Sequence, residues 1–210
     1  MGSGKGDALL TAGDLECHRG DRLLFRGLEF AIRAGQVLQV QGPNGSGKTS
    51  LLRILCGLTL PTAGAIHWRG KDIARDRARF LSELTYIGHQ NGVKLALSPM
   101  ENLRVARALM EGPPAQPPRE ALARLNLWRF ADTPAYALSA GQQRRIALAR
   151  LPLAHTACWI LDEPFTALDK DGIAAVESLL EEHAQSGGIT VLTTHQPIGI
   201  QADSVREICL

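Results

Sequence analysis

Closely spaced cysteines are absent from this sequence. Its four cysteines, Cys17, Cys56, Cys158 and Cys209, lie far apart, and they form no C-x-x-C pair. This spacing argues against a zinc site and against covalent haem attachment, because both need thiols that are close in the sequence. Scattered single cysteines are typical of a reduced, cytosolic protein, and we therefore expect free thiols.

Long apolar runs and a strong net charge are also missing. No apolar run approaches the roughly 20 residues that a membrane-spanning helix needs, and the opening MGSGKGDALL lacks the apolar region of a signal peptide. We therefore expect any membrane spans to belong to another chain. The 23 basic and 21 acidic residues nearly cancel, which disfavours nucleic acid as a partner. Two arginine-rich segments, 75–79 and 144–150, are expected to be solvated faces rather than binding patches.

The sequence does contain the alternating elements of an α/β protein. Its 210 residues, 45% of them hydrophobic, suffice for a sizeable core. Residues 28–41 alternate apolar and polar positions before a glycine-rich turn and a helical pattern at 48–58, which predicts a strand, a loop and a helix. Apolar runs at 84–89, 157–162 and 189–194 predict further buried strands. Strands separated by helical segments favour a largely parallel sheet that is covered on both faces.

The middle of the chain lacks strand-like runs and is dominated by Ala, Leu and Arg. Helical patterns lie at 99–110, 119–125 and 140–151. The segment GPPAQPP at 112–118 is expected to be a turn or connector, because proline interrupts helices. We therefore expect a single domain in which a core, residues 8–89 and 152–210, carries an inserted helical subdomain at 90–151.

The segment GPNGSGKT fits the phosphate-binding pattern G-x-x-x-x-G-K-[ST], and it stands after a predicted strand and at the start of a predicted helix. Its glycines let backbone amides wrap phosphate oxygens, Lys48 can reach the β- and γ-phosphates, and the Thr49 hydroxyl can ligate Mg²⁺. The alternative, a glycine-rich turn that happens to carry lysine, is disfavoured by this context. The expected ATP-binding residues are Gly42, Pro43, Asn44, Gly45, Ser46, Gly47, Lys48, Thr49 and Ser50.

A buried strand that ends in two carboxylates, ACWILDEP, supplies a second part of a nucleotide site. Asp162 is expected near Mg²⁺, and Glu163 where it can orient or deprotonate an attacking water. The simpler alternative, an aspartate that caps a following helix, is disfavoured by the phosphate loop elsewhere in the chain. Adjacent carboxylates at a buried strand end repel each other, which suggests a cation between or near them.

In this order, GPNGSGKT, LSAGQ and LDEP resemble the nucleotide-binding subunits of ABC transporters over nearly the whole chain. The resemblance implies a RecA-like P-loop NTPase core with an N-terminal antiparallel β region, and ATP hydrolysis in which Lys48 and Glu163 take part. It implies that Gln90 touches Mg²⁺ and the attacking water, and that His195 contacts the γ-phosphate. The segment TALD, which ends at Asp169, resembles the D-loop. Without the resemblance, Gln90 would be interpreted as a surface loop residue and His195 as a structural histidine at the end of a strand.

The segment LSAGQ resembles the ABC signature LSGGQ with one change. The resemblance implies that it closes over ATP held by a second copy in a head-to-tail homodimer, where the Ser139 hydroxyl and the Gly141 amide contact the γ-phosphate. Replacing glycine by alanine costs free energy where the backbone is left-handed. The alanine at this position therefore predicts an ordinary right-handed helix start, whose free amides can still bind an anion. The signature residues are Leu138, Ser139, Ala140, Gly141 and Gln142.

Four longer segments, LSAGQQRRIALARL, IGHQNGVK, LDEPFTALD and TTHQP, are similar to the ATP-binding subunits of cytochrome c biogenesis haem exporters. The resemblance implies ATP and Mg²⁺ as ligands, a CcmB-like transmembrane subunit, and CcmC, CcmD and a CcmE-like haem chaperone nearby. It also implies a peripheral position on the cytoplasmic side of a bacterial inner membrane. ATP then drives haem export or release of the haem-loaded chaperone. Nothing in this chain selects haem, so the partners must recognise the cargo.

Two departures from the family pattern carry further expectations. ABC domains commonly stack adenine on an aromatic residue, whereas this chain has CHRG at 17–20, so either His18 or Arg19 is expected to take that place. Pro152 is expected to bend or stop the signature helix.

Three other functions remain possible at this point. They are an ABC ATPase subunit for another cargo, a soluble ABC ATPase that acts on DNA or ribosomes, and a nucleotide-gated clamp that binds ATP without hydrolysis. The short chain argues against the second, and Glu163 and His195 argue against the third.

Overall fold

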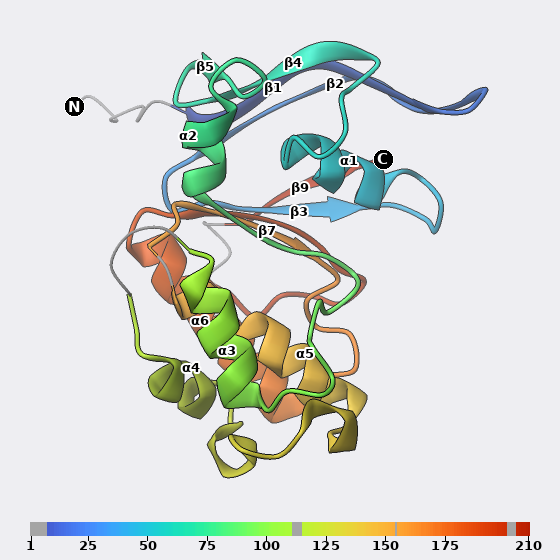
Figure 1. Ribbon diagram of the computed structural model, residues 1–210. Coiled ribbons are helices and arrows are strands. Elements are labelled where there is room, and N and C mark those ends of the chain that lie inside the picture. The colour runs from blue at the N-terminus through green and yellow to red at the C-terminus, as the bar shows by residue number, and fades with distance from the viewer. Residues whose placement is uncertain (1–7, 111–114, 154, 201–204) are drawn as a thin grey trace.

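Two β-sheets dominate the computed structural model, which describes residues 8–110, 115–153, 155–200 and 205–210 (Figure 1). A five-stranded parallel sheet has the order β6-β7-β8-β3-β9, and a four-stranded antiparallel sheet has the order β2-β1-β4-β5. The expected α/β class, with a mostly parallel sheet and an N-terminal antiparallel region, is therefore confirmed. The strands are β1 (Ala8–Arg19), β2 (Arg22–Arg33), β3 (Val37–Gln41), β4 (Ala63–Trp68), β5 (Lys71–Asp72), β6 (Leu84–Ile87), β7 (Cys158–Asp162), β8 (Ile189–Thr193) and β9 (Val205–Cys209).

The single strand predicted at 28–41 is wrong, because the chain turns there and passes from one sheet to the other. Strand β2 ends at Arg33 and β3 begins at Val37. Gly35 makes the turn with φ 78, and its amide donates to the Gly188 carbonyl at 3.0 Å. The alternation of apolar and polar residues continues through this turn, so periodicity alone hides the break.

The parallel sheet is buried on both faces, and successive residues of its strands serve different cores. In β7, Trp159 and Leu161 join one apolar cluster, whereas Cys158 and Ile160 join the other. Helix α1 (Lys48–Leu55) lies between the two sheets, and α6 (Lys170–Gln185) covers the opposite face together with the helices of the middle region (Figure 1). The near-continuous apolar pattern of β7 and β8 follows from this double coverage.

The remaining helices are α2 (Arg77–Ser82), α3 (Pro99–Ala108), α4 (Pro118–Arg124) and α5 (Ala140–Leu148), with short 3₁₀ turns at Trp128–Phe130, Ala135–Ala137 and Leu151–Leu153. Helix α5 ends at Leu148, and Pro152 lies in the 3₁₀ turn that follows, so the helix stops before the proline as expected. Helix α1 ends earlier than predicted because Gly57 adopts φ 64. Part of the proline-rich connector, residues 112–114, lies outside the described residues.

Three of the four cysteines are buried and Cys209 is exposed, and all four are free thiols. Burial raises the pKa of the Cys56 and Cys158 thiols well above the ordinary range, which disfavours the reactive thiolate. In the described part of the chain, no helix is both long and apolar enough to cross a membrane.

His183 is a partly buried titratable group that joins α6 to the parallel sheet. Its ring stacks on Trp159 with centroids 3.8 Å apart, and Nε2 lies 3.2 Å from the Ile189 carbonyl oxygen. Burial lowers the pKa of His183 from its ordinary value of 6.5 to about 4, although hydrogen bonds to the Ile189 and Ala157 carbonyls oppose this shift. Because the folded pKa is depressed, the unfolded chain binds the proton more tightly between pH 6.5 and pH 4.

We therefore predict that protonation of His183 destabilises the fold as the pH falls. Relative to His183→Phe, which keeps a stacking ring but cannot titrate, the free energy of unfolding of the wild type should drop by about 2 kcal/mol from pH 7 to pH 5. Urea denaturation at both pH values measures this difference. Parallel pH profiles for the two proteins would show that His183 is not held neutral.

Candidate functional site

The phosphate loop joins the end of β3 to the start of α1, and its backbone requires glycine at both ends. Gly42 has φ 145 and Gly47 has φ 110. A Cβ atom on Gly42 would lie 2.9 Å from the Leu210 carbonyl oxygen, and one on Gly47 would lie 3.1 Å from Leu24 Cβ. The amides of this loop and of the first turn of α1 therefore form a concave, anion-attracting surface.

Lys48 folds back over the phosphate loop. Its Nζ donates to the Gly42 carbonyl at 2.7 Å and to the Pro43 carbonyl at 3.2 Å. An ammonium held only by neutral carbonyls remains able to pair with phosphate oxygens in the same cavity. The Oγ atom of Ser46, in the same loop, is buried without a hydrogen-bond partner in the described chain, and Ser46 does not line the nucleotide cavity.

The Asp162 carboxylate connects the phosphate loop helix to the parallel sheet. Its Oδ2 accepts from the Thr49 hydroxyl at 3.0 Å, and its Oδ1 accepts from the Thr193 hydroxyl at 2.8 Å. Asp162 is 2% exposed and Thr193 is fully buried. Since Asp162 ends β7 and Thr193 ends the adjacent β8, the carboxyl ends of two strands and the start of α1 meet at this carboxylate.

Glu163 follows Asp162 in a backbone conformation that is unusual for a side-chain-bearing residue. Its φ is 50, and its amide donates to Thr193 Oγ1 at 2.9 Å. Its Oε1 lies 3.5 Å from His195 Nε2. The turn therefore sends the two neighbouring carboxylates in different directions, one toward Thr49 and the other toward His195, which relieves the repulsion expected between them.

Arg144 is a site residue that the sequence analysis missed, and the expected solvated face at 144–150 is wrong at this position. Arg144 is 4% exposed. Its Nη1 donates to the Gly88 carbonyl at 2.9 Å and to Asn91 Oδ1 at 3.1 Å, and its Nη2 donates to the carbonyls of Asp162 at 2.6 Å and Glu163 at 3.0 Å. Burial lowers the pKa of Arg144, while the nearby charges of Asp162 and Glu163 oppose that shift.

The signal that reveals Arg144 is helical periodicity. In α5, Arg144, Ala147 and Leu148 are all buried, which is the i, i+3, i+4 spacing of one helix face. An arginine on an apolar face has to find acceptors inside the protein.

A cavity of about 520 Å³ brings most of the predicted nucleotide residues together. It is lined by Asn44, Gly45, Gly47, Lys48, Thr49, Ser50, Asp162, Glu163 and His195, and also by Arg19, Leu24, His89 and Thr166. Gln90 is exposed and does not line this cavity, whereas its neighbour His89 does. The role of Gln90 in catalysis therefore stays a prediction.

The contacts of His18 and Arg19 favour Arg19 as the residue beside a nucleotide base. His18 Nε2 lies 2.8 Å from Glu16 Oε1, so its ring is engaged with that carboxylate. Arg19 lines the cavity next to the phosphate loop together with Leu24. A guanidinium plane and an aliphatic side chain can both pack against a flat base.

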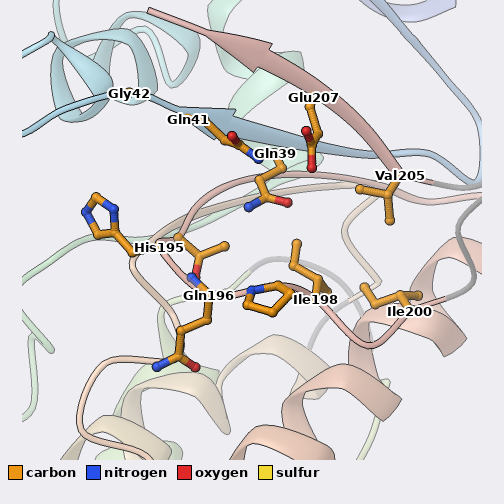
Figure 2. Close-up of a pocket in the computed structure, with 11 residues that line it drawn as sticks. Gln39, Gln41, Gly42, His195, Gln196, Ile198, Ile200, Val205 and Glu207 are labelled. Carbon is orange, nitrogen blue, oxygen red and sulfur yellow. The ribbon is translucent and has the colours of Figure 1, made fainter.

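A second cavity, of about 570 Å³, lies on another side of His195. Figure 2 shows Gln39, Gln41 and Glu207 along one side of it and the segment from His195 to Ile200 along the other. His195 therefore stands between two open spaces, which fits its side-chain exposure of 58%.

The signature segment does not line the cavity at the chain's own phosphate loop. Ser139 caps α5: its Oγ accepts from the Gln142 amide at 3.2 Å, and Gln142 Oε1 accepts from the Ser139 amide at 2.9 Å. Ala140 is the first residue of the helix and is not in the left-handed region, as the sequence predicted.

The first turn of α5 packs against the segment 166–169. A Cβ atom on Gly141 would lie 2.4 Å from the Ala167 carbonyl oxygen. Arg145 Nη2 donates to both carboxylate oxygens of Asp169 at 2.6 Å, and Asp169 Oδ1 caps α6 through the Gly172 amide. These hydrogen bonds, that of Gly172 first, lower the pKa of Asp169. The signature turn is thus fixed to the end of the segment that follows Glu163.

The oxygen atoms of Thr49 and Asp162 fit the preference of Mg²⁺. Mg²⁺ takes hard oxygen ligands and usually keeps several waters, so a hydroxyl and one carboxylate are a sufficient protein contribution beside phosphate oxygens. Within the described ranges, no group of three or more His, Cys, Asp and Glu residues could hold a metal ion alone. The site therefore suits a metal that arrives with a phosphate ligand.

Comparisons with known proteins agree with this geometry. The sequence profile of the ABC transporter family matches residues 25–166. The chain is 53% identical over 199 residues to the cytochrome c biogenesis ATP-binding export protein CcmA of Methylococcus capsulatus, covering 94% of this chain and 96% of that protein. It is 48% identical to CcmA of Yersinia pestis, covering 96% and 93%. A solved ATP-binding subunit of an ABC transporter superposes with a TM-score of 0.79 at 25% identity, covering 89% and 79%.

The close approach of Gly141 to the Ala167 carbonyl predicts that the two small residues of the signature differ in tolerance. Gly141→Asp should greatly reduce ATP hydrolysis, since any side chain there must displace 166–169. Ala140→Gly should be far milder, because Ala140 is exposed and its backbone is ordinary. Steady-state ATP hydrolysis by both variants measures this, and comparable losses would overturn the assignment of Gly141.

Proposed function

The chain belongs to the ABC transporter family and, within it, to the cytochrome c biogenesis ATP-binding export proteins, and we propose the following mechanism for its site. It is the subunit that binds and hydrolyses ATP for an export complex of cytochrome c biogenesis. The observation that carries this proposal is the cluster in which Asp162 bridges Thr49 and Thr193 while Glu163 faces His195.

ATP binding rests on the phosphate loop. The amides of residues 44–47 and the N-terminus of α1 wrap the β- and γ-phosphate oxygens, and Lys48 exchanges its carbonyl partners for these oxygens. Thr49 and Asp162 would hold Mg²⁺ through their oxygen atoms, and the ion would supply positive charge that offsets the charge of the phosphates. Arg19 and Leu24 are placed to pack against the base.

Hydrolysis follows from the orientation of Glu163. Its carboxylate takes a proton from a water molecule whose oxygen forms a bond to the γ-phosphorus. The bond from that phosphorus to the β–γ bridging oxygen breaks, and ADP leaves with the electron pair. His195 lies next to both Glu163 and the cavity, so it can donate a hydrogen bond to the γ-phosphate. Gln90 is proposed to join them when its loop closes.

A second copy of the chain completes the site in this proposal. The signature residues lie outside the chain's own nucleotide cavity, and Ser139 and Gly141 sit at a capped helix start that can accept an anion. A twofold homodimer places each signature over the partner's ATP, so that two sites form at one interface. ATP then acts as the contact that holds the dimer together.

We predict that Glu163→Gln abolishes ATP hydrolysis and traps an ATP-bound dimer. The amide keeps the size of the side chain but cannot accept the proton, so ATP should stay between the two copies. Turnover and size-exclusion chromatography with ATP and Mg²⁺ test both parts, and Glu120→Gln, on the exposed side of α4, is the matched control. Unchanged hydrolysis by Glu163→Gln would remove Glu163 from its role.

The proposed partners are a CcmB-like transmembrane subunit, CcmC, CcmD and a CcmE-like haem chaperone, at the cytoplasmic face of a bacterial inner membrane. We also propose that residues 90–151 act as a helical subdomain through which the membrane subunit is coupled to the core. A groove of about 460 Å³, which has both apolar and polar walls, supports this proposal. It lies between α2, β6 and the end of α3, and its walls include Leu81, Tyr86 and Leu109.

Leu109 lines this groove and is 82% exposed, so its side chain is accessible to a partner. We predict that Leu109→Asp weakens co-purification with the transmembrane subunit expressed alongside it, because a charge cannot be buried in an apolar contact. Leu60→Asp is the control, since Leu60 is 78% exposed in a different part of the chain. Equal retention of both variants by the membrane subunit would place the contact elsewhere.

A further inference from the structure

One buried guanidinium joins three segments that are distant in the sequence. Arg144 comes from α5, directly after the signature, and donates through Nη1 to Gly88 and Asn91 and through Nη2 to Asp162 and Glu163. Its Nε has no hydrogen-bond partner in the described part of the chain, so these hydrogen bonds are made by Nη1 and Nη2 alone. Burying a cation costs desolvation free energy, which hydrogen bonds of this kind have to offset.

The contacts of Nη2 act on the backbone that orients Glu163. Glu163 has φ 50, a conformation that a non-glycine residue keeps only when its surroundings hold it there. The carbonyls of Asp162 and Glu163 both accept from the same nitrogen, which fixes the peptide on each side of the Glu163 Cα. The direction of the Glu163 carboxylate toward His195 depends on this turn.

The contacts of Nη1 act on the loop that carries His89 and Gln90. Gly88 and Asn91 stand immediately before and after these two residues, and both accept from Nη1. His89 lines the nucleotide cavity, although Gln90 does not. A shift of this loop or of α5 would therefore displace the Arg144 side chain, which also holds the turn at Glu163.

We infer that Arg144 is a positioning residue for ATP hydrolysis, which holds Glu163 in its productive turn and ties that turn to the 88–91 loop and the signature helix. This inference rests on the proposed function, in which Glu163 takes a proton from water. Arg144 does not touch the phosphate loop or the cavity, so its loss should slow the chemical step and leave ATP affinity largely intact. Lysine cannot replace it, because a single ammonium cannot span two separate pairs of acceptors.

The test compares Arg144→Met and Arg144→Lys with wild type in the full chain. Methionine fills much of the volume without placing an unpaired polar group in the core. We expect Arg144→Met to lower kcat on the order of 100-fold, as small displacements of a catalytic group do, while the ATP Kd from calorimetry stays within about threefold. Arg144→Lys should bind ATP equally well and remain well below wild-type kcat.

Arg124→Gln is the control for a purely structural loss. Arg124 makes an ion pair with Glu182 that links α4 to α6 outside the nucleotide cavity, so its removal also takes one arginine contact from the fold. Wild-type kcat in Arg144→Met, or equal losses of kcat and ATP affinity in Arg144→Met and Arg124→Gln, would overturn the inference. If the wild type with ATP and Mg²⁺ shows no hydrolysis, the proposed function fails instead, whatever Arg144 does.

Discussion

The buried carboxylate of Asp162 is the contact on which the site depends. It receives hydroxyl hydrogen bonds from Thr49 on α1 and Thr193 on β8, and Thr193 also accepts from the Glu163 amide. A carboxylate that is 2% exposed has to be satisfied by donors, and removing one partner of such a group typically costs about 1–3 kcal/mol or more. The phosphate loop, the sheet edge and the turn at Glu163 are therefore held in place by one group, which in the proposed function would also offer an oxygen to Mg²⁺.

Sheet topology explains why these groups meet. The strands β7, β8 and β3 are adjacent and parallel, so their carboxyl ends lie at one edge of the sheet. The phosphate loop leaves β3, Glu163 follows β7 and His195 follows β8, and a ligand crevice forms where such ends converge. Arg144 extends this arrangement into the helical region, because its fork reaches the carbonyls at the end of β7. Helix α5 is thereby joined to the turn at Glu163, although Arg144 does not line the nucleotide cavity.

Contiguous motifs made part of this site predictable. Lys48, Thr49, Asp162 and Glu163 belong to contiguous segments at the ends of predicted strands, whereas the expected role of His195 rests on the resemblance to ABC transporter subunits. Thr193 and Arg144 act through partners far away in the sequence, so neither carries a local signal strong enough to assign a role. The charge of Arg144 predicts a solvated face, whereas its helical spacing with Ala147 and Leu148 indicates a buried one. The turn at Gly35 cannot be recognised from periodicity, because the alternation of apolar and polar residues continues through it.

The signature shows the same division between local and tertiary information. The ordinary backbone of Ala140 followed from the preferences of alanine, whereas the lack of space at Gly141 depends on the Ala167 carbonyl from another segment. Arg145 and Asp169 strengthen that contact. In the proposed homodimer, these contacts would tie the signature turn to the segment that follows Glu163.

The Mg²⁺ dependence of ATP hydrolysis, measured for wild type and Asp162→Asn, tests the role of this carboxylate most directly. The amide keeps the shape of the side chain and can still bond both threonine hydroxyls, but it lacks the charge that favours a divalent cation. The account predicts that the half-saturating Mg²⁺ concentration rises at least on the order of 10-fold in Asp162→Asn. An unchanged Mg²⁺ requirement with unchanged turnover would contradict it.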